Sequence, residues 1–445
     1  MKVLFLTSSL GNGHVRAADA IKQALIQNNS NGRDCFSSLD LWSLMDDTVA
    51  SAIKDTYLRL TREFPECYQQ LYDLDDDILN QLAGKKPLNP GIREFLIEQQ
   101  QHWFPQLRSR VGGIGDNLDQ TLLNTLILCL CANGESYSGR ILPHSLLYLM
   151  RGLLLKRMQE KILTIRPDIV VATQMYPAIL FTHLKANRQF STVPCLRVAT
   201  DHGAQKIWAD LRADKYCVSN EEFSKNLQSW GVPTNKISVT GIPIMPKFQR
   251  VPNQADARHT LNIPLDRKTI LVTGGQYGIG IVDTISTIPQ VGESYHVLVA
   301  AGNLSEEMFD TLKLAQQYRA GITILNKEVD MIYPLAAADV VVGKPGGLSV
   351  SEALACGRPF YATCSLGGQE QHNIRFLSQN RIGGKVELNQ LPKVLADFFQ
   401  SPSHYREIQQ RALQGSYRDG AIKIADIIYN LSNPDQNIPR YSDTC

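Results

Sequence analysis

Two glycine-rich turns, far apart in the chain, each stand between an apolar segment and a helical pattern. The first, residues 7–14, reads TSSLGNGH and follows the apolar residues 3–6. The second, residues 343–347, reads GKPGG and follows residues 339–342. A strand, a glycine turn and a helix direct backbone N–H groups and the positive end of the helix dipole at one point, which suits an anion such as phosphate. The sequence therefore predicts an acceptor side and a nucleotide side that face each other across a cleft.

Short apolar segments alternate with helical patterns in the first third and the last half of the chain. Strands are predicted at 2–6, 168–172, 195–199, 215–218, 236–239, 269–273, 296–300, 323–325, 340–342 and 360–362. This pattern is typical of parallel sheets covered by helices on both faces. A proline-rich stretch at 241–252 interrupts it. We therefore expect an α/β protein with two doubly wound domains, residues 1–246 and 247–445, and a mainly helical insertion at about 50–165.

Composition excludes several classes of protein. An apolar fraction of 43% and a charged fraction of 20% are those of a folded protein, and a net charge of +2 argues against nucleic-acid binding. The nine cysteines contain no C-x-x-C pair, so we expect neither a disulfide framework nor a zinc site. This cysteine usage is typical of a protein in a reducing compartment. The sequence shows no signal peptide and no apolar run of spanning length. A cytoplasmic location, with or without peripheral membrane association, is expected.

The predicted insertion contains two charged stretches. The first has four aspartates, which suit either a metal ion with a sugar nucleotide or a solvated helix face; they are Asp73, Asp75, Asp76 and Asp77. The second, residues 141–166, combines leucines with Arg151, Lys156, Arg157, Lys161 and Arg166. A basic amphipathic helix of this kind lies on an anionic membrane surface or packs in a core with a basic outer face. Both interpretations stay open for both stretches.

The first half carries candidate residues at two turns. Gly11, Asn12, Gly13 and His14 form the first, and an imidazole in the first turn of a helix stays neutral and can accept a proton. A cap or a packing residue is the alternative for this histidine. The second turn follows a predicted strand and contains three candidates, which are Asp201, His202 and Trp208. The aspartate either orients the histidine of the first turn, holds an acceptor or caps a helix. The tryptophan belongs to the core or to a sugar-stacking face.

The second half carries candidates at three turns. Residues 274–280 contain four glycines, Gly274, Gly275, Gly278 and Gly280, which permit close approach to a diphosphate. In the next turn, Gly346 and Gly347 begin a helix that suits phosphate. The same helix carries Ser349 and Glu352, and the glutamate is placed to accept hydrogen bonds from ribose hydroxyls. The third turn offers side chains suited to sugar hydroxyls, namely Gln369, Glu370 and Asn373, unless it is an ordinary polar connection.

Taken in order, these motifs carry a resemblance. Gly-Asn-Gly-His, residues 201–208, residues 237–243, the Lys344 to Gly347 turn with Glu352, and residues 368–370 with Asn373 resemble one family. That family contains the monogalactosyldiacylglycerol synthases and the bacterial processive diacylglycerol glucosyltransferases. More distantly, the chain resembles the peptidoglycan N-acetylglucosaminyltransferase. The resemblance covers roughly residues 1–30 and 165–385.

The resemblance implies a GT-B fold of two Rossmann-like domains with the UDP-sugar on the C-terminal one. It implies inverting, metal-independent transfer of a hexose to a lipid hydroxyl such as that of diacylglycerol, with no cofactor besides the donor. By this resemblance His14 matches the proposed base. If the base lies elsewhere, Asp201 at its strand end is the next candidate. Glu352 matches the ribose ligand, and Gln369 and Glu370 match the contacts to the donor sugar. We expect the protein to bind an anionic membrane surface, where a lipid acceptor would be found.

The chain departs from the family pattern at three places. His202 stands where an aromatic residue is usual, and Gln205 where a histidine is frequent. The segment between Asp47 and Arg166 is longer than in compact members. These departures keep two alternatives open, a GT-B glycosyltransferase for a soluble acceptor and a UDP-sugar-binding regulator that has lost catalysis.

Overall fold

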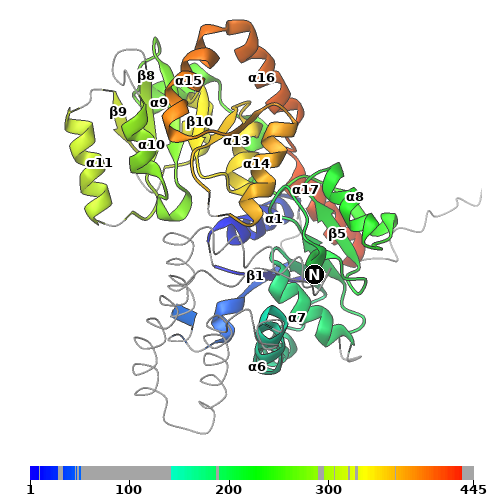
Figure 1. Ribbon diagram of the computed structural model, residues 1–445. Helices are drawn as coiled ribbons and strands as arrows, with labels where there is room; N and C mark the ends of the chain where they lie inside the picture. The colour runs from blue at the N-terminus through cyan, green and yellow to red at the C-terminus, as the bar shows by residue number, and fades with distance from the viewer. Residues whose placement is uncertain are drawn as a thin grey trace, which may run out of the picture.

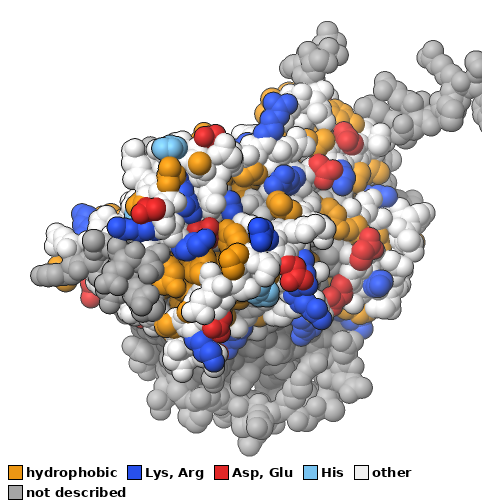
Figure 2. Space-filling view, turned by 90° about the horizontal axis from the view of Figure 1, so that it is seen from above, with side chains coloured by type: hydrophobic (Ala, Val, Ile, Leu, Met, Phe, Trp, Pro, Cys, Tyr) orange, Lys and Arg blue, Asp and Glu red, His pale blue; other side chains and the backbone are white. Residues whose placement is uncertain are grey.

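The computed structural model describes residues 1–9, 11–28, 34–45, 47, 50–51, 142–186, 190–288, 295–304, 306–318, 321–325, 329–365 and 367–432. Two six-stranded parallel sheets follow each other along these residues, and helices cover both faces of each (Figure 1). We call the body around the first sheet the N-terminal half and the body around the second the C-terminal half. On the face of the C-terminal half that Figure 2 shows, Lys and Arg side chains are interspersed with Asp and Glu, as a net charge near zero requires.

The N-terminal sheet has the strand order β2-β1-β3-β4-β5-β6. Its strands are β1 Lys2–Thr7, β2 Cys35–Asp40, β3 Ile169–Ala172, β4 Cys195–Val198, β5 Lys215–Val218 and β6 Ile237–Val239. Its helices are α1 Gly13–Asn28, α6 Leu142–Ile165, α7 Met175–Ala186 and α8 Glu221–Ser229. Neighbouring side chains of β1 enter different cores, because Leu4 and Leu6 pack in one cluster and Val3 and Phe5 in another. Burial on both faces explains why this strand is a continuous apolar run.

The C-terminal sheet has the order β12-β11-β10-β7-β8-β9. Its strands are β7 Lys268–Thr273, β8 Tyr295–Ala300, β9 Ile322–Ile324, β10 Val340–Gly343, β11 Phe360–Ala362 and β12 Gly383–Lys385. The helices around it are α9 Gln254–Thr260, α10 Ile281–Thr287, α11 Glu306–Tyr318, α12 Ile332–Ala337, α13 Gly347–Ala355, α14 Gln369–Gln379, α15 Leu391–Gln400 and α16 Pro402–Gln414. In each half the central strands run parallel, so their carboxyl ends share one edge of the sheet.

The last helix belongs to the other half. Helix α17, Gly420–Ser432, lies beside α1 (Figure 1), and Ala421, Ile424 and Ile428 pack in one cluster with Phe5. The expected second domain of residues 247–445 therefore needs a correction, because its final described helix completes the N-terminal core. A helical pattern shows which face of a helix is buried but not which partner buries it.

The strands predicted from apolar runs are all present, and two edge strands are additional. Strand β2 has no continuous apolar run, because Ser37 and Ser38 interrupt it and only Leu39 is buried, and β12 contains Gly383 and Gly384. Of the expected insertion, the structure describes residues 50–51 and α6, so the four aspartates at 73–77 lie outside the described residues. None of the described helices combines the length and the apolarity needed to cross a bilayer.

Candidate active site

A cavity of about 370 Å³ lies between the two halves. Its walls come from the turns that follow β1 and β4 on one side and β7, β8 and β10 on the other, where ligands of doubly wound sheets bind. Most residues predicted from the sequence line it: Gly11, Asn12, Gly13, His14, Asp201, Gly274, Gly275, Gly346, Gly347, Ser349, Glu352, Gln369 and Glu370. Segments more than 300 residues apart in the chain therefore meet at one site.

His14 is fixed by contacts to one of its ring nitrogens. Nδ1 lies 2.8 Å from the carbonyl oxygen of Thr173 and 2.9 Å from Oγ1 of Thr200. A carbonyl only accepts, so Nδ1 carries the proton of the neutral ring and Nε2 is left as the basic nitrogen. Burial lowers the pKa of His14 below its usual value, while the charge of Asp201 and the bond to Thr173 act in the opposite direction. The ring is therefore neutral at physiological pH and able to accept a proton.

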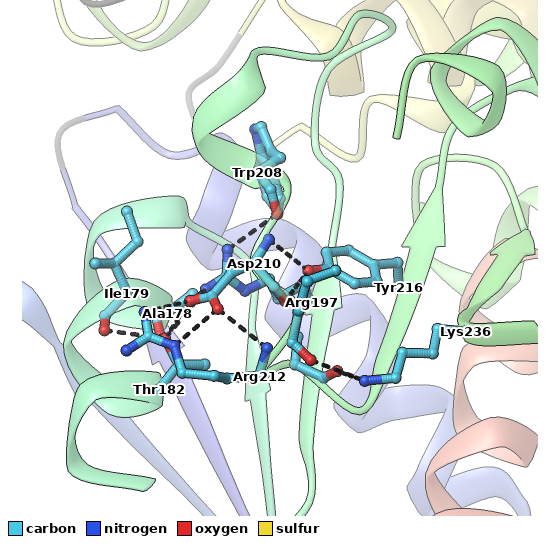
Figure 3. Close-up of polar contacts among 11 residues, drawn as sticks. Ala178, Ile179, Thr182, Arg197, Trp208, Asp210, Arg212, Tyr216 and Lys236 are labelled. Atoms are coloured by element: carbon cyan, nitrogen blue, oxygen red, sulfur yellow. Dashed lines mark hydrogen bonds and ion pairs between the residues drawn. The ribbon is translucent and has the colours of Figure 1, made fainter. Parts of the chain in front are cut away.

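A buried charge network holds the loop that carries Asp201. This loop joins β4 to β5, and Arg197 at the end of β4 has no exposed surface. Its guanidinium donates to Asp210 Oδ2 at 2.9 Å and to the carbonyl oxygen of Trp208 at 3.1 Å (Figure 3). Burial opposes ionisation of Asp210, but hydrogen bonds from Arg212 and the charge of Arg197 hold its pKa well below the usual value. The part of the loop at Trp208 and Asp210 is thus tied to strand β4.

The opposite wall presents backbone from glycine turns, together with Lys344 and the carboxylates of Glu352 and Glu370. Gly275 has φ of +66°, in the left-handed region that favours glycine, and lines the cavity with Gly274. Helix α13 begins at Gly347, so its first N–H groups and the positive end of its dipole lie at the cavity. Lys344, between this turn and β10, forms an ion pair with Glu370. The wall is therefore suited to an anion such as a diphosphate.

Glu352 joins the two halves. Its carboxylate accepts a hydrogen bond from Arg16 of α1, and the two side chains form an ion pair across the cavity. The glutamate side chain is 3% exposed and the arginine 40%, so the pair is accessible from the arginine side. Burial raises the pKa of Glu352 and Arg16 opposes that rise. The carboxylate of Glu352 is thus held at the cavity wall, as the sequence predicted. The sequence did not predict its cationic partner, Arg16.

Gly280 and four other residues predicted from the sequence do not line the cavity. Trp208 lies in a hydrophobic cluster with its ring edge against Phe223, so it belongs to the core rather than to a sugar-stacking face. Gly278 is a turn glycine against Leu304. His202 and Asn373 are both buried at the contact between the halves. Spacing along a chain places a residue on a turn, but it does not decide the direction of its side chain.

Sequence reasoning did not select Thr173, Thr200, Arg16 or Lys344 as site residues. Thr173, Thr200 and Lys344 lie within two residues of the carboxyl end of a strand, and that position is the signal that could have found them, whereas Arg16 lies on α1. Arg16 was recognisable only as the residue that replaces the third glycine of a dinucleotide turn. Thr173 also donates to the carbonyl oxygen of His14 at 2.9 Å, so it holds the histidine through backbone and side chain together.

Comparison with known proteins finds relatives that extend over nearly the whole chain. Residues 132–244 match the family model described as monogalactosyldiacylglycerol (MGDG) synthase. A processive diacylglycerol beta-glucosyltransferase of Bacillus cytotoxicus is 24% identical over 98% of this chain and 95% of the relative. The enzyme of the same name from Staphylococcus epidermidis is 24% identical over 99% of this chain and 97% of the relative. The chain is a homologue of these glycosyltransferases. The resemblance inferred from the motifs is confirmed.

Solved structures share the architecture at low sequence identity. MurG of Acinetobacter baumannii superposes with a TM-score of 0.53 and 13% identity, covering 96% of this chain and 99% of that one. The UDP-GlcNAc 2-epimerase of Neisseria meningitidis superposes with a TM-score of 0.54 and 10% identity, covering 97% of this chain and 100% of that one. The fold is therefore GT-B, as expected. An epimerase and a MurG share it, so the fold does not by itself select the reaction.

Proposed function

We propose that this protein is an inverting glycosyltransferase that moves a hexose from a UDP-sugar to a lipid hydroxyl, with diacylglycerol as the first acceptor to test. The names of its homologues support the reaction class and the acceptor. The observation that carries the proposal is a neutral, tethered His14 across one cavity from the Gly275 turn and the start of α13. A base on one wall and an anion-binding surface on the other are what displacement of UDP by a hydroxyl requires.

On the acceptor side, Nε2 of His14 takes the proton of the attacking hydroxyl. The oxygen forms a bond to the anomeric carbon on the face opposite UDP, and the bond from that carbon to the diphosphate oxygen breaks. Asp201 stabilises the imidazolium that forms, because its charge favours the protonated ring. Thr173 and Thr200 keep Nδ1 engaged, so the ring presents the same nitrogen throughout.

On the donor side, the leaving diphosphate gains negative charge as the bond breaks. The turn at Gly275, the N-terminus of α13 and Lys344 provide fixed positive potential there, which stabilises that charge without reorganisation. Glu352 accepts hydrogen bonds from ribose hydroxyls, and Gln369 and Glu370 bind the hexose. We propose that no divalent ion takes part, so UDP affinity and transfer should be unchanged in excess EDTA.

The test is transfer by the purified full chain. The protein is incubated with radiolabelled UDP-glucose, UDP-galactose or UDP-N-acetylglucosamine and vesicles containing diacylglycerol, and lipid products are identified by mass spectrometry. A hexosyl-diacylglycerol formed from one of these donors is the expected result. Transfer only to a water-soluble acceptor would mean that the protein is a glycosyltransferase for a soluble acceptor and not for a lipid. UDP binding without transfer or donor hydrolysis would favour a UDP-sugar-binding regulator.

We also propose that α6 brings the enzyme to an anionic membrane surface. Lys156, Lys161 and Leu163 are exposed on this helix, whereas Arg157 donates to the carbonyl oxygen of Leu44 and serves the fold. Each exposed cation near such a surface contributes about 1 kcal/mol, and salt screens the attraction. The protein should sediment with anionic vesicles at low salt and much less with neutral ones.

Matched variants distinguish a specific contribution of α6 to membrane binding from the effect of removing any two exposed positive charges. Replacing Lys156 and Lys161 with Gln should weaken sedimentation, while replacing the exposed Lys225 and Lys393 of other helices should not. Equal sedimentation of the two double variants would mean that α6 is not the membrane-facing element.

A further inference from the structure

Asn373 on α14 is the meeting point of the two halves. It has no exposed surface. Its Oδ1 accepts from the backbone N–H of His202 at 2.8 Å, and its Nδ2 donates to Asp201 Oδ1 at 2.9 Å and to the carbonyl oxygen of Pro345 at 2.9 Å. Both amide hydrogens and the amide oxygen are thus engaged. Two of these partners belong to the β4–β5 loop of the N-terminal half and one to the turn before α13.

Two further contacts fix the same loop to the C-terminal half. The His202 ring stacks on Phe376 with centroids 3.9 Å apart and planes 4° from parallel. Its Nε2 lies 3.2 Å from Ser351 Oγ, and that hydroxyl donates to the carbonyl oxygen of Gly347, so Nε2–H is the donor to Ser351. The loop therefore rests on both α13 and α14 through the buried His202 ring and the partly buried Ser351 and Phe376.

The loop held in this way also carries the groups around the proposed base. Thr200 Oγ1 lies 2.9 Å from Nδ1 of His14, and Asp201 is the carboxylate whose charge favours its protonated form. Asn373 touches neither His14 nor the cavity. Its hydrogen bond to Asp201 is nevertheless the link between the base on the N-terminal half and a helix of the C-terminal half.

We propose that Asn373 is a positioning residue that fixes Asp201 beside His14 only while the two halves are closed on each other. The catalytic base is then complete only in the closed molecule, so that donor and acceptor must both be enclosed before the proton is taken. This inference rests on the proposed function. It replaces the expected contact between Asn373 and the donor sugar, for which the amide has no remaining hydrogen.

The test separates positioning from donor binding. In Asn373→Ala, kcat should fall at least about tenfold, less than the loss of about 10²–10⁴ expected when a general base is removed, while UDP affinity stays within about twofold. Without the bond from Asn373, Asp201 no longer stays near His14, so the acid limb of the kcat/KM profile should move to lower pH. Gln379→Ala, an exposed change on the same helix, is the matched control and should alter none of these values.

The pH readout must be assigned to His14 among its charged neighbours. The charged side chains that line the same cavity are Arg16, Asp201, Lys344, Glu352 and Glu370. Asp201→Asn provides the second variant, because it keeps an oxygen for Asn373 and removes only the charge. It should move the acid limb in the same direction as Asn373→Ala while the His202 amide stays protected from hydrogen exchange.

Hydrogen exchange makes the two proposals separately refutable. The His202 N–H donates to Asn373, so its exchange should accelerate at least about tenfold in Asn373→Ala whether or not the protein transfers sugar. Unchanged exchange, or an unchanged acid limb with kcat within twofold of wild type, would overturn the positioning role. A tenfold loss of UDP affinity with unchanged kcat would make Asn373 a donor ligand instead. If wild type transfers no sugar but its His202 amide is protected, the proposed function fails and the contact stands.

Discussion

At the residue scale, the site depends on carboxylates kept at a cavity wall by cations from the other side of the cavity or from a neighbouring turn. Glu352 is the clearest case, since it is almost wholly buried and meets Arg16 of the opposite half. A buried carboxylate left without partners is costly, so the site must supply hydrogen bonds in every state. Ribose hydroxyls can provide them when the nucleotide is bound.

Replacing this glutamate tests its role in nucleotide binding. Glu352→Ala should weaken UDP affinity by about 1–3 kcal/mol, the usual loss when polar partners are left unpaired, and calorimetry measures it directly. Glu352→Gln keeps an acceptor oxygen and should lose less. Equal UDP affinity in wild type and the alanine variant would reduce Glu352 to a structural ion pair with Arg16.

At the element scale, the start of α13 is packed backbone to backbone against the other half. A Cβ added at Gly347 would lie 2.0 Å from the carbonyl oxygen of Thr200, which is fixed backbone and cannot yield as a flexible side chain would. Gly347→Ala should therefore separate α13 from the loop at Asp201 and abolish transfer, while circular dichroism shows both sheets still folded.

The control for this variant is Gly415→Ala at the end of α16, where φ is −81° and an added Cβ would lie 3.4 Å from its nearest neighbour, the carbonyl oxygen of Arg411. This control should be fully active. Normal transfer by Gly347→Ala would mean that the halves do not need this close contact.

At the scale of the whole molecule, buried histidines make stability depend on pH. Burial lowers the pKa of His202 to about 3 and that of His296 to about 4, against about 6.5 in the unfolded chain. Between these values the unfolded state binds more protons, so the free energy of unfolding should fall as pH drops from about 6.5 towards 4. His202→Asn should flatten this slope in denaturant titrations at several pH values. A wild-type slope of zero over this range would contradict the account.

Much of the fold was predictable because parallel strands buried on both faces are continuous apolar runs, as at β1 and β10. The edge strands β2 and β12 lack that signature, and no pattern in α17 names the half against which it packs. The cavity residues were found where glycine turns follow strands. The sequence left Trp208 between the core and a sugar-stacking face, and it predicted Asn373 in a polar turn, whereas this residue lies buried on α14. Neither position could be settled, since side-chain direction depends on contacts such as those of Arg197 and Asp201.

The most direct test of the account is transfer by His14→Ala. His14 lies at the N-terminal end of α1, so its replacement should leave the protein folded. The variant should bind the UDP-sugar with wild-type affinity. Its transfer rate, measured under saturating donor, should fall by about 10²–10⁴, the worth of a general base. A variant that binds the donor normally and transfers within tenfold of the wild-type rate would show that the proton goes elsewhere and would contradict the central claim.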